Sequence, residues 1–128
     1  MTKTVVVTDE APEAIGPYSQ GVVAGPGRIV FVSGQLPVDP ATGKLEQGPA
    51  SAQARKSLEN VRAVLDKAGL SMSHVVKTTI FLADLTSFKE VNQVYAEFFD
   101  EPYPARATVQ VAALPLGAQV EIECIAVG

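Results

Sequence analysis

Residues 106–127 read RATVQVAALPLGAQVEIECIAV, and this stretch decides how the chain is expected to fold. On either side of the turn at Leu114–Gly117, apolar and polar residues alternate with the period of a β-strand. The alternation predicts a hairpin of two strands, Arg106–Ala112 and Gln119–Val127. One set of side chains is uniformly apolar and is expected to face helices: Ala107, Val109, Val111, Val120, Ile122, Cys124 and Ala126.

The other face of this predicted hairpin mixes charged, polar and apolar side chains. Its members are Arg106, Thr108, Gln110, Glu121, Ile125 and Val127. A strand predicted over Val75–Leu82 is likewise apolar on both faces. Because two helices cannot cover both faces of one sheet, the second apolar face predicts another subunit. The pattern therefore favours a homo-oligomer assembled sheet face to sheet face.

Upstream of this region the chain shows three short strand signals and one amphipathic helix. The strands are expected at Val5–Val7, Gln20–Ala24 and Ile29–Val32, where β-branched residues are bounded by turn residues. The helix is expected over Ala50–Ala68, with Gly69 at its C-terminal cap. Its apolar positions fall at helical spacing: Ala54, Leu58, Val61 and Leu65.

A second helix is predicted to begin at Ser87–Glu90, which has the spacing of a capping box. It continues with an apolar stripe made of Phe88, Val91, Tyr95, Phe98 and Phe99. The predicted order is three strands, a helix, a strand, a helix and two strands. This order is typical of an α+β fold with both helices on one face of a mixed sheet.

Composition limits the classes of function. With 128 residues, 47% hydrophobic and 19% charged, the chain is expected to form one globular domain over residues 1–128. The single cysteine, Cys124, excludes an internal disulfide, and with the single histidine, His74, it excludes a usual Cys/His zinc site. The net charge of −4 argues against nucleic-acid binding. No apolar run resembles a signal peptide or a membrane span, so a cytoplasmic protein with a small-molecule ligand is predicted.

The sequence contains few candidates for a catalytic nucleophile or its base. Cys124 belongs to the helix-facing apolar set, which is typical of a buried structural thiol. His74 is expected in an exposed linker just before a strand. Fingerprints of nucleotide-binding loops and of serine hydrolases do not occur.

Arg106 and Glu121 remain as a charged pair on the predicted non-helix face. A guanidinium can bind the carboxylate of a small acid through two parallel hydrogen bonds, and a carboxylate can position or deprotonate water. The same pair could equally be a salt bridge at the rim of a subunit interface. If Gln110 lies opposite Glu121, Arg106 is about 13 Å further along the hairpin. A site shared by both residues would then need a neighbouring subunit.

Several short motifs together resemble a known family over essentially the whole chain. They are AIGPYSQ at 14–20, SGQ at 33–35, VVKTTIFLADL at 75–85, PAR at 104–106 and VAALPLGAQVEIECIAVG at 111–128, with Gln53 and Asn60 between them. Their order and spacing resemble the RidA/YjgF group of the reactive intermediate deaminase family.

That resemblance implies a chorismate-mutase-like α+β fold. It also implies a homotrimer whose sheets line the interior and whose sites lie in clefts between subunits. The implied activity is hydrolysis of 2-iminobutanoate and 2-iminopropanoate to 2-keto acids and ammonia. These imines arise from enamines released by pyridoxal-phosphate dehydratases. No metal and no cofactor are implied.

The resemblance also assigns roles to individual residues. Arg106 matches the anchor of the substrate carboxylate, and Glu121 matches the acid that orients water or moves protons. Other matched residues line the cleft: Tyr18, Ser33, Gly34 and Asn92. Tyr18 could instead be an ordinary turn aromatic, and Asn92 a solvent-facing helix residue. Thr108 stands where many relatives have cysteine, and its hydroxyl could donate a hydrogen bond to the substrate.

Two other classes of function stay open at this point. Some relatives are named translation inhibitors or endoribonucleases, although an acidic chain with one histidine is poorly suited to phosphodiester cleavage. Others act without catalysis, as ligand sensors or chaperone-like scaffolds. A cleft that binds carboxylates would serve a sensor as well as a hydrolase.

Overall fold

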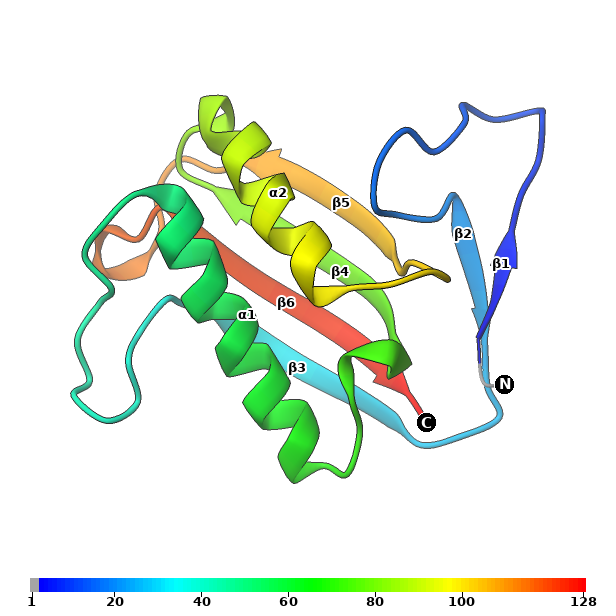
Figure 1. Cartoon of the computed structure of the whole chain (residues 1–128), viewed down its shortest axis with the longest axis horizontal. Helices are drawn as coiled ribbons and strands as arrows, with labels where there is room; N and C mark the ends of the chain where they lie inside the picture. The colour runs from blue at the N-terminus through cyan, green and yellow to red at the C-terminus, as the bar shows by residue number, and fades with distance from the viewer. Residues whose placement is uncertain (1–2) are drawn as a thin grey trace.

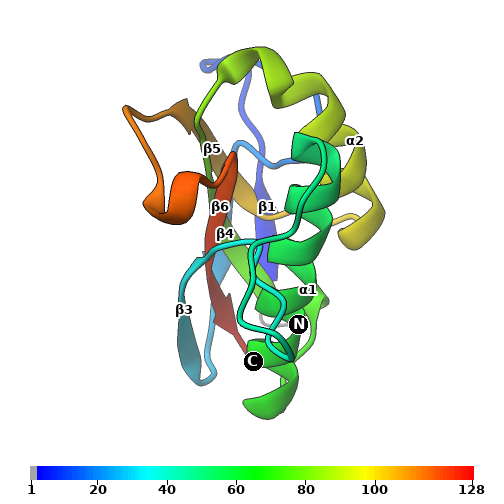
Figure 2. The ribbon, with the colours of Figure 1, turned by 90° about the vertical axis from the view of Figure 1, so that its left-hand side faces the viewer.

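The computed structural model describes residues 3–128 and has a four-stranded mixed sheet with two α-helices on one face (Figures 1 and 2). The strand order is β3 (Ile29–Gln35), β6 (Val120–Val127), β4 (Val75–Leu82) and β5 (Ala105–Gln110). β6 is antiparallel to both of its neighbours, whereas β5 is parallel to β4. The predicted mixed α+β fold with two helices on one face is therefore confirmed.

A separate antiparallel ribbon of β1 (Lys3–Val6) and β2 (Gly21–Ala24) lies beside the β5 edge (Figure 1). The bridge between Ser19 and Ala105 attaches it to this edge. Lys3 is buried at the start of the ribbon, and its Nζ donates a 2.9 Å hydrogen bond to the carbonyl of Val75. The ribbon carries the segment that precedes β2, including Tyr18, toward the open edge of the sheet.

The predicted hairpin of the last two strands is wrong, because β4 lies between β5 and β6. The connection at 111–119 passes over the end of β4 and hydrogen-bonds to it at both of its ends. Val111 N donates to the carbonyl of Leu82 at 2.9 Å, and Ala83 N donates to the carbonyl of Gln119 at 3.0 Å. This connection needs to span only the roughly 10 Å between next-nearest strands, which is well within its reach.

The helices are α1 (Ala50–Lys67) and α2 (Phe88–Phe98). The predicted apolar stripe of α1 is confirmed, since its members are buried against the sheet: Ala54, Leu58, Val61 and Leu65. Gly69 follows the helix with φ +80°, a conformation that glycine adopts without strain. Each buried leucine contributes about 2 kcal/mol of transfer free energy, so this stripe holds α1 in place.

The capping box predicted at the start of α2 is wrong. Ser87 has helical backbone angles and its side chain makes no capping hydrogen bond. A short 3-10 turn at Leu85–Ser87 precedes the helix, and the carboxylate of Asp84 accepts the Thr86 N–H at 2.9 Å. The helical turns therefore begin earlier than predicted, at Leu85, and Asp84 is the capping residue instead of Ser87.

Alternation along β6 is confirmed, but the side-chain directions in β5 are inverted. Val120, Ile122, Cys124 and Ala126 are buried beneath the helices, as predicted. In β5 it is Arg106 that points to the helix side, because it pairs with Thr78, whose side chain is buried against α2. Val109 is consequently 43% exposed. The edge strand is only partly covered by α2, which leaves room for a polar side chain there.

The sheet face opposite the helices is open within residues 3–128 (Figure 2). Ile29 and Phe31 of β3 project from it, and Phe31 is 72% exposed. An apolar second face that the helices do not cover is therefore confirmed, while the homo-oligomer inferred from it stays a prediction. Within residues 3–128 no helix combines the length and apolar character needed to cross a bilayer.

Candidate active site

Arg106 is held among three aromatic rings where β5 meets α2. Its Cζ lies 4.8 Å from the centre of the Tyr95 ring, 5.2 Å from that of Tyr18 and 5.4 Å from that of Phe88. Its Nη1 also donates a 2.7 Å hydrogen bond to Oδ1 of Asn92. Each cation–π contact at a partly desolvated site contributes on the order of 1 kcal/mol. The cage therefore fixes the guanidinium while using few of its donors.

One face of α2 supplies most of this cage. Phe88, Asn92 and Tyr95 stand at positions i, i+4 and i+7, so their side chains line up on the same side of the helix. Asn92 was expected at the site, and the structure brings it there. Phe88 and Tyr95 were missed because an aromatic stripe at helical spacing is equally typical of core packing. The polar Asn92 in the middle of that stripe is the signal that could have distinguished the two.

Tyr95 lies beneath the guanidinium and is completely buried. Its hydroxyl is 2.9 Å from Oγ1 of Thr78 on β4. Burial raises the pKa of Tyr95 to about 12, although the hydrogen bond with Thr78 and the charge of Arg106 oppose this shift. Tyr95 is therefore a neutral phenol at physiological pH and supports Arg106 by position and polarisation.

No carboxylate among residues 3–128 forms an ion pair with Arg106. Burial lowers the pKa of Arg106, yet a guanidinium stays protonated throughout the physiological range. A half-buried cation without a counter-ion attracts an anion, and the flat guanidinium fork suits a carboxylate. The electrostatics at this position thus favour a small acid as the ligand.

A pocket of about 510 Å³ opens over Arg106. Its walls are largely apolar, with polar groups from the predicted site, and are made of Ile15, Gly16, Tyr18, Leu85, Phe88, Asn92, Arg106 and Thr108. The Oγ1 of Thr108 is buried and has no hydrogen-bond partner among the described residues. Leaving a buried hydroxyl unpaired costs about 1–3 kcal/mol, so this atom is an unsatisfied polar group beside the pocket.

Gln20 gives shape to the loop that presents Tyr18 to the pocket. Its Nε2 donates to the carbonyls of Ala11 and Pro12, at 3.3 and 2.7 Å, and its Oε1 accepts the Thr8 N–H at 2.7 Å. The side chain thereby closes the segment before β2 into a compact loop. Gln20 belongs to the AIGPYSQ motif, but sequence pattern does not predict this role because its partners lie in irregular backbone.

A larger hollow of about 780 Å³ lies under the N-terminal ribbon and borders on Tyr18. Its titratable lining is acidic, from Asp9, Glu13 and Glu101. These carboxylates would repel an anionic ligand. The chemistry predicted for this protein therefore fits the smaller pocket over Arg106 better than the larger hollow.

Glu121 lies on the other face of the sheet, next to a β-bulge at Ser33–Gly34. The bulge appears as a register shift in the β3–β6 pairing between Val32 and Gln35. A Cβ placed on Gly34 would lie 2.8 Å from Cδ of Glu121 and closer still to Oε2. Glycine is therefore needed at residue 34 for the carboxyl group of Glu121 to pack where it does.

The prediction that Arg106 and Glu121 share one sheet face is wrong. Phe81 of β4 pairs with Glu121 on one side and with Val109 on the other. Two strand spacings and three residues along the strand therefore separate Arg106 from Glu121, a distance of about 14 Å. Within one chain they form neither a salt bridge nor a common site for a small ligand.

The predicted site residues consequently fall into two groups. On the helix side, the pocket over Arg106 is lined by Tyr18, Asn92 and Thr108. On the open face, Glu121 lies against Gly34, and Ser33 belongs to the same bulge. The roles predicted for all of these residues stay predictions, but their placement defines two half-sites.

Cys124 and His74 have structural surroundings. Cys124 is 3% exposed, and burial raises the pKa of its thiol to about 12, which removes thiolate reactivity. Nδ1 of His74 accepts the Ser71 N–H at 3.0 Å and so closes a 3-10 turn before β4. Within residues 3–128, no three His, Cys, Asp or Glu side chains gather as a metal site.

Residues 8–128 match the family described as Endoribonuclease L-PSP. This chain belongs to that family. It is 54% identical over 127 residues to Protein DfrA of Myxococcus xanthus, covering 99% of this chain and 97% of that one. It is 46% identical over 127 residues to the 2-iminobutanoate/2-iminopropanoate deaminase of Bos taurus, covering 99% and 91%.

Solved structures also resemble this fold over nearly the whole chain. The crystal structure of E. coli TdcF with bound serine has a TM-score of 0.75 and 48% identity, and the likeness covers 98% of each chain. The RidA/YjgF resemblance read from the sequence motifs is thereby confirmed. The family's names refer to two different activities, an endoribonuclease and an imine deaminase.

Proposed function

We propose that this protein is a 2-imino acid deaminase that hydrolyses 2-iminobutanoate and 2-iminopropanoate to 2-keto acids and ammonia. One observation carries this proposal: a half-buried guanidinium, Arg106, faces a pocket and has no acidic partner among residues 3–128. Relatives named as imine deaminases over nearly the whole chain support the same reaction. No cofactor enters the proposed reaction.

The proposed reaction needs little from the protein beyond binding the imine and orienting a water molecule. Water adds to the protonated imine carbon to give a carbinolamine, which then loses ammonia as its C–N bond breaks and the carbonyl forms. Arg106 binds the substrate carboxylate, and Thr108 and Asn92 contribute further hydrogen bonds. Fixing the imine beside an ordered water is the largest contribution, because it makes a bimolecular encounter effectively unimolecular.

Glu121 is the proposed proton carrier in this reaction. A carboxylate that takes a proton from the attacking water and returns it to the leaving nitrogen adds typically 10²–10⁴-fold in rate. Glu121 and Arg106 of one chain are too far apart to act on the same small molecule. The reaction therefore requires that a neighbouring subunit supplies one of the two half-sites.

We propose a homotrimer whose sheets face its interior, so that Arg106 of one subunit meets Glu121 of the next. The open sheet face, with Ile29 and Phe31 exposed on β3, supports this assembly. Tyr18 would lie on the Arg106 side of the shared cleft, and Ser33 and Gly34 on the Glu121 side.

We further propose that residues 1–128 form one domain of the family. We also propose that the protein resides in the cytoplasm. A single buried cysteine is compatible with reducing surroundings. Fractionation of cells that produce this protein, followed by immunodetection, tests the compartment directly.

The test is a coupled assay in which a serine or threonine dehydratase generates the enamine and semicarbazide traps the imine. Wild-type protein is expected to reduce trapping and to speed keto-acid formation, whereas Arg106→Ala should do neither. If wild type leaves trapping unchanged with both substrates, the deaminase proposal is wrong. The protein would then be a carboxylate sensor if it still binds 2-ketobutyrate.

The family description names an endoribonuclease, so RNA cleavage is the second outcome to examine. The net charge of −4 and the engagement of His74 in a turn argue against it. Intrinsic cleavage should co-purify with the protein and disappear in Arg106→Ala. Cleavage that survives in this variant would indicate a contaminating nuclease.

A further inference from the structure

The backbone around Glu121 has a strand partner on only one side among the described residues. Pairing of β4 with β6 continues to Leu82–Val120, whereas pairing of β3 with β6 ends at Gln35–Ile122. After the bulge, β3 pairs with β6 once more and then ends at Gln35, one residue pair short of Glu121. The carboxylate proposed to move protons therefore stands where the β3 side of the ladder stops.

Near the place where this strand pairing ends, a side chain of α1 hydrogen-bonds to the backbone just before β6. The Gln119 N–H, two residues before Glu121, donates a 2.8 Å hydrogen bond to Oε1 of Gln53. At its other end, Nε2 of Gln53 donates to the carbonyl of Glu46 at 2.9 Å. Gln53 itself is only 3% exposed, whereas both hydrogen bonds are partly buried because Glu46 and Gln119 are partly exposed. This buried amide links the start of β6 to the loop that precedes α1.

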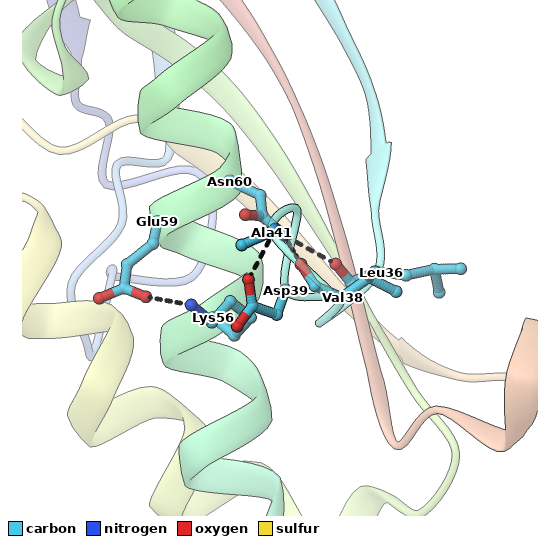
Figure 3. Close-up of polar contacts among 7 residues, drawn as sticks. All are labelled: Leu36, Val38, Asp39, Ala41, Lys56, Glu59 and Asn60. Atoms are coloured by element: carbon cyan, nitrogen blue, oxygen red, sulfur yellow. Dashed lines mark hydrogen bonds and ion pairs between the residues drawn. The ribbon is translucent and has the colours of Figure 1, made fainter. Parts of the chain in front are cut away.

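A second side-chain amide of the same helix hydrogen-bonds to the backbone that follows β3. Asn60, seven residues after Gln53, donates from Nδ2 to the carbonyls of Leu36 and Val38 at 3.1 and 2.9 Å (Figure 3). These carbonyls follow directly after the segment in which Gly34 packs against Glu121. Asn60 thereby fixes the backbone just after β3, and Gln53 fixes the backbone just before β6.

The neighbouring charged pair on α1 offers a contrast. Lys56 and Glu59 form an ion pair of 3.3 Å on the surface of the helix, and Figure 3 shows it apart from the bonds of Asn60 to the loop. The Gln53 amide is buried and the Asn60 amide is half-buried, and both join α1 to backbone beside the sheet. A partly exposed ion pair within one helix contributes little. The amides, and not the ion pair, are in the right place to constrain the sheet.

We propose that Gln53 and Asn60 are positioning residues for Glu121, acting through the backbone from the opposite face of the sheet. Gln53 sets the entry of β6, and Asn60 keeps Gly34 against the carboxyl group. The proposal rests on the proposed function in that Glu121 moves the protons of the reaction. A displacement of about 1 Å at such a group can cost on the order of 100-fold in rate.

The first experiment separates catalysis from ligand binding. Gln53→Leu removes both hydrogen bonds at similar size, and Asn60→Asp removes the two donors. Each is expected to lower kcat for imine hydrolysis about 10- to 100-fold. The Kd for 2-ketobutyrate should stay within about twofold, because Arg106 is held by β5 and α2. Gln53→Glu, which keeps the acceptor for Gln119, should retain more activity than Gln53→Leu.

Two control variants on the same helix distinguish positioning from general destabilisation. Lys56→Ala removes the surface ion pair, and Val61→Ala opens a core cavity without touching either amide. Both should keep wild-type kcat at a temperature where circular dichroism shows them folded. If Val61→Ala lowers kcat as much as Gln53→Leu, the amides are merely structural and the proposal is wrong.

A double-variant comparison makes the same distinction within the mechanism. In a Glu121→Gln background, Gln53→Leu and Asn60→Asp should cause no further loss of kcat, since they act only through Glu121. Losses that multiply would overturn the proposal. If Gln53→Leu does not fold, Asn60→Asp alone decides the outcome, because its substitution is nearly isosteric.

A final measurement does not depend on deaminase activity. The ¹³C chemical shift of the Glu121 carboxyl group, assigned with Glu121→Gln, is measured by NMR at pH 7. Gln53→Leu and Asn60→Asp should change this chemical shift, and Lys56→Ala should not. Unchanged shifts in both amide variants overturn the positioning proposal. Absent turnover in wild type with altered shifts in the variants refutes only the proposed function.

Discussion

Arg106 and Glu121 lie on opposite faces of one sheet, separated by two strand spacings along the β5–β4–β6 order. Arg106 faces α2 and its pocket, while Glu121 faces the open side next to Gly34. A single chain thus carries its proposed anion-binding residue and its proposed proton carrier at positions that cannot meet within it. Because of this separation, ligand binding at Arg106, the position of Glu121 and subunit assembly can each be measured independently.

Gly34→Ala is expected to displace the carboxyl group of Glu121 without changing the pocket over Arg106. The new Cβ would lie 2.8 Å from Cδ of Glu121, so the carboxyl group must move. Because the clash is with the movable end of a partly exposed side chain, the free energy of unfolding should fall by only about 0.5 kcal/mol. Turnover should fall at least tenfold, while the Kd for 2-ketobutyrate stays near that of wild type.

Urea denaturation of Gly34→Ala and of the double variant Gly34→Ala/Glu121→Ala checks the cause. Shortening Glu121 removes the clash, so the double variant should regain most of the lost stability. If the double variant is as unstable as Gly34→Ala, the cost arises from the backbone of the bulge and not from the Glu121 contact.

Replacement of Tyr95 should separate the roles of its ring and its hydroxyl group. Tyr95→Phe keeps the ring beneath Arg106 but leaves Oγ1 of Thr78 buried without its partner. Thermal denaturation is expected to show a loss of about 1–2 kcal/mol, with little change in carboxylate affinity.

Tyr95→Leu is the matched comparison, because it also removes the ring that lies 4.8 Å from Cζ of Arg106. Calorimetric titration with 2-ketobutyrate should then show weaker binding than Tyr95→Phe. Equal affinities in the two variants would mean that the Tyr95 ring does not support the guanidinium.

Phe31→Glu is expected to disrupt the proposed trimer without unfolding the subunit. Phe31 is 72% exposed on the open sheet face, so a charge there costs nothing in an isolated chain but opposes burial in an interface. Light scattering should report a shift from trimer to monomer, and deaminase activity should be lost with it.

Lys44→Glu serves as the control for Phe31→Glu, because it also adds negative charge but lies in an exposed loop. It should leave both mass and activity unchanged. A monomeric mass for the wild-type protein itself at micromolar concentration would contradict the assembly and the shared site together.

Stability should decline at alkaline pH through Cys124 and Tyr95. Burial raises both pKa values to about 12, from 9.0 for the thiol and 10.0 for the phenol. The folded state therefore favours the neutral forms. This contribution is fully present below pH 9 and is lost as the pH rises toward 12.

Urea midpoints at pH 8 and pH 10.5 measure this effect. Cys124→Ala should be less stable than wild type at pH 8 because of the cavity, but should lose less stability between the two pH values. A thiol reagent should react with native wild-type protein only as fast as the protein opens. Rapid labelling at pH 8 would contradict the buried, neutral thiol.

Local pattern was enough to predict the elements of this fold. The stripe of Leu58, Val61 and Leu65 predicts α1 because helical periodicity depends only on near neighbours in sequence. The run Val75–Leu82 predicts β4 with the bounds found in the structure, and the motifs around Arg106 and Glu121 point to the residues of the site.

The tertiary structure alone decided which strands pair and which face each side chain takes. Alternation in β5 and β6 has the same period whether these strands are neighbours or flank β4, so it could not exclude the hairpin. The side of Arg106 is set by its register with Thr78, and its aromatic cage by the packing of α2. The contact of Gly34 with Glu121 and the side-chain amides of Gln53 and Asn60 also join segments distant in sequence. Short-range periodicity determined what each segment is, and long-range packing determined what each residue touches.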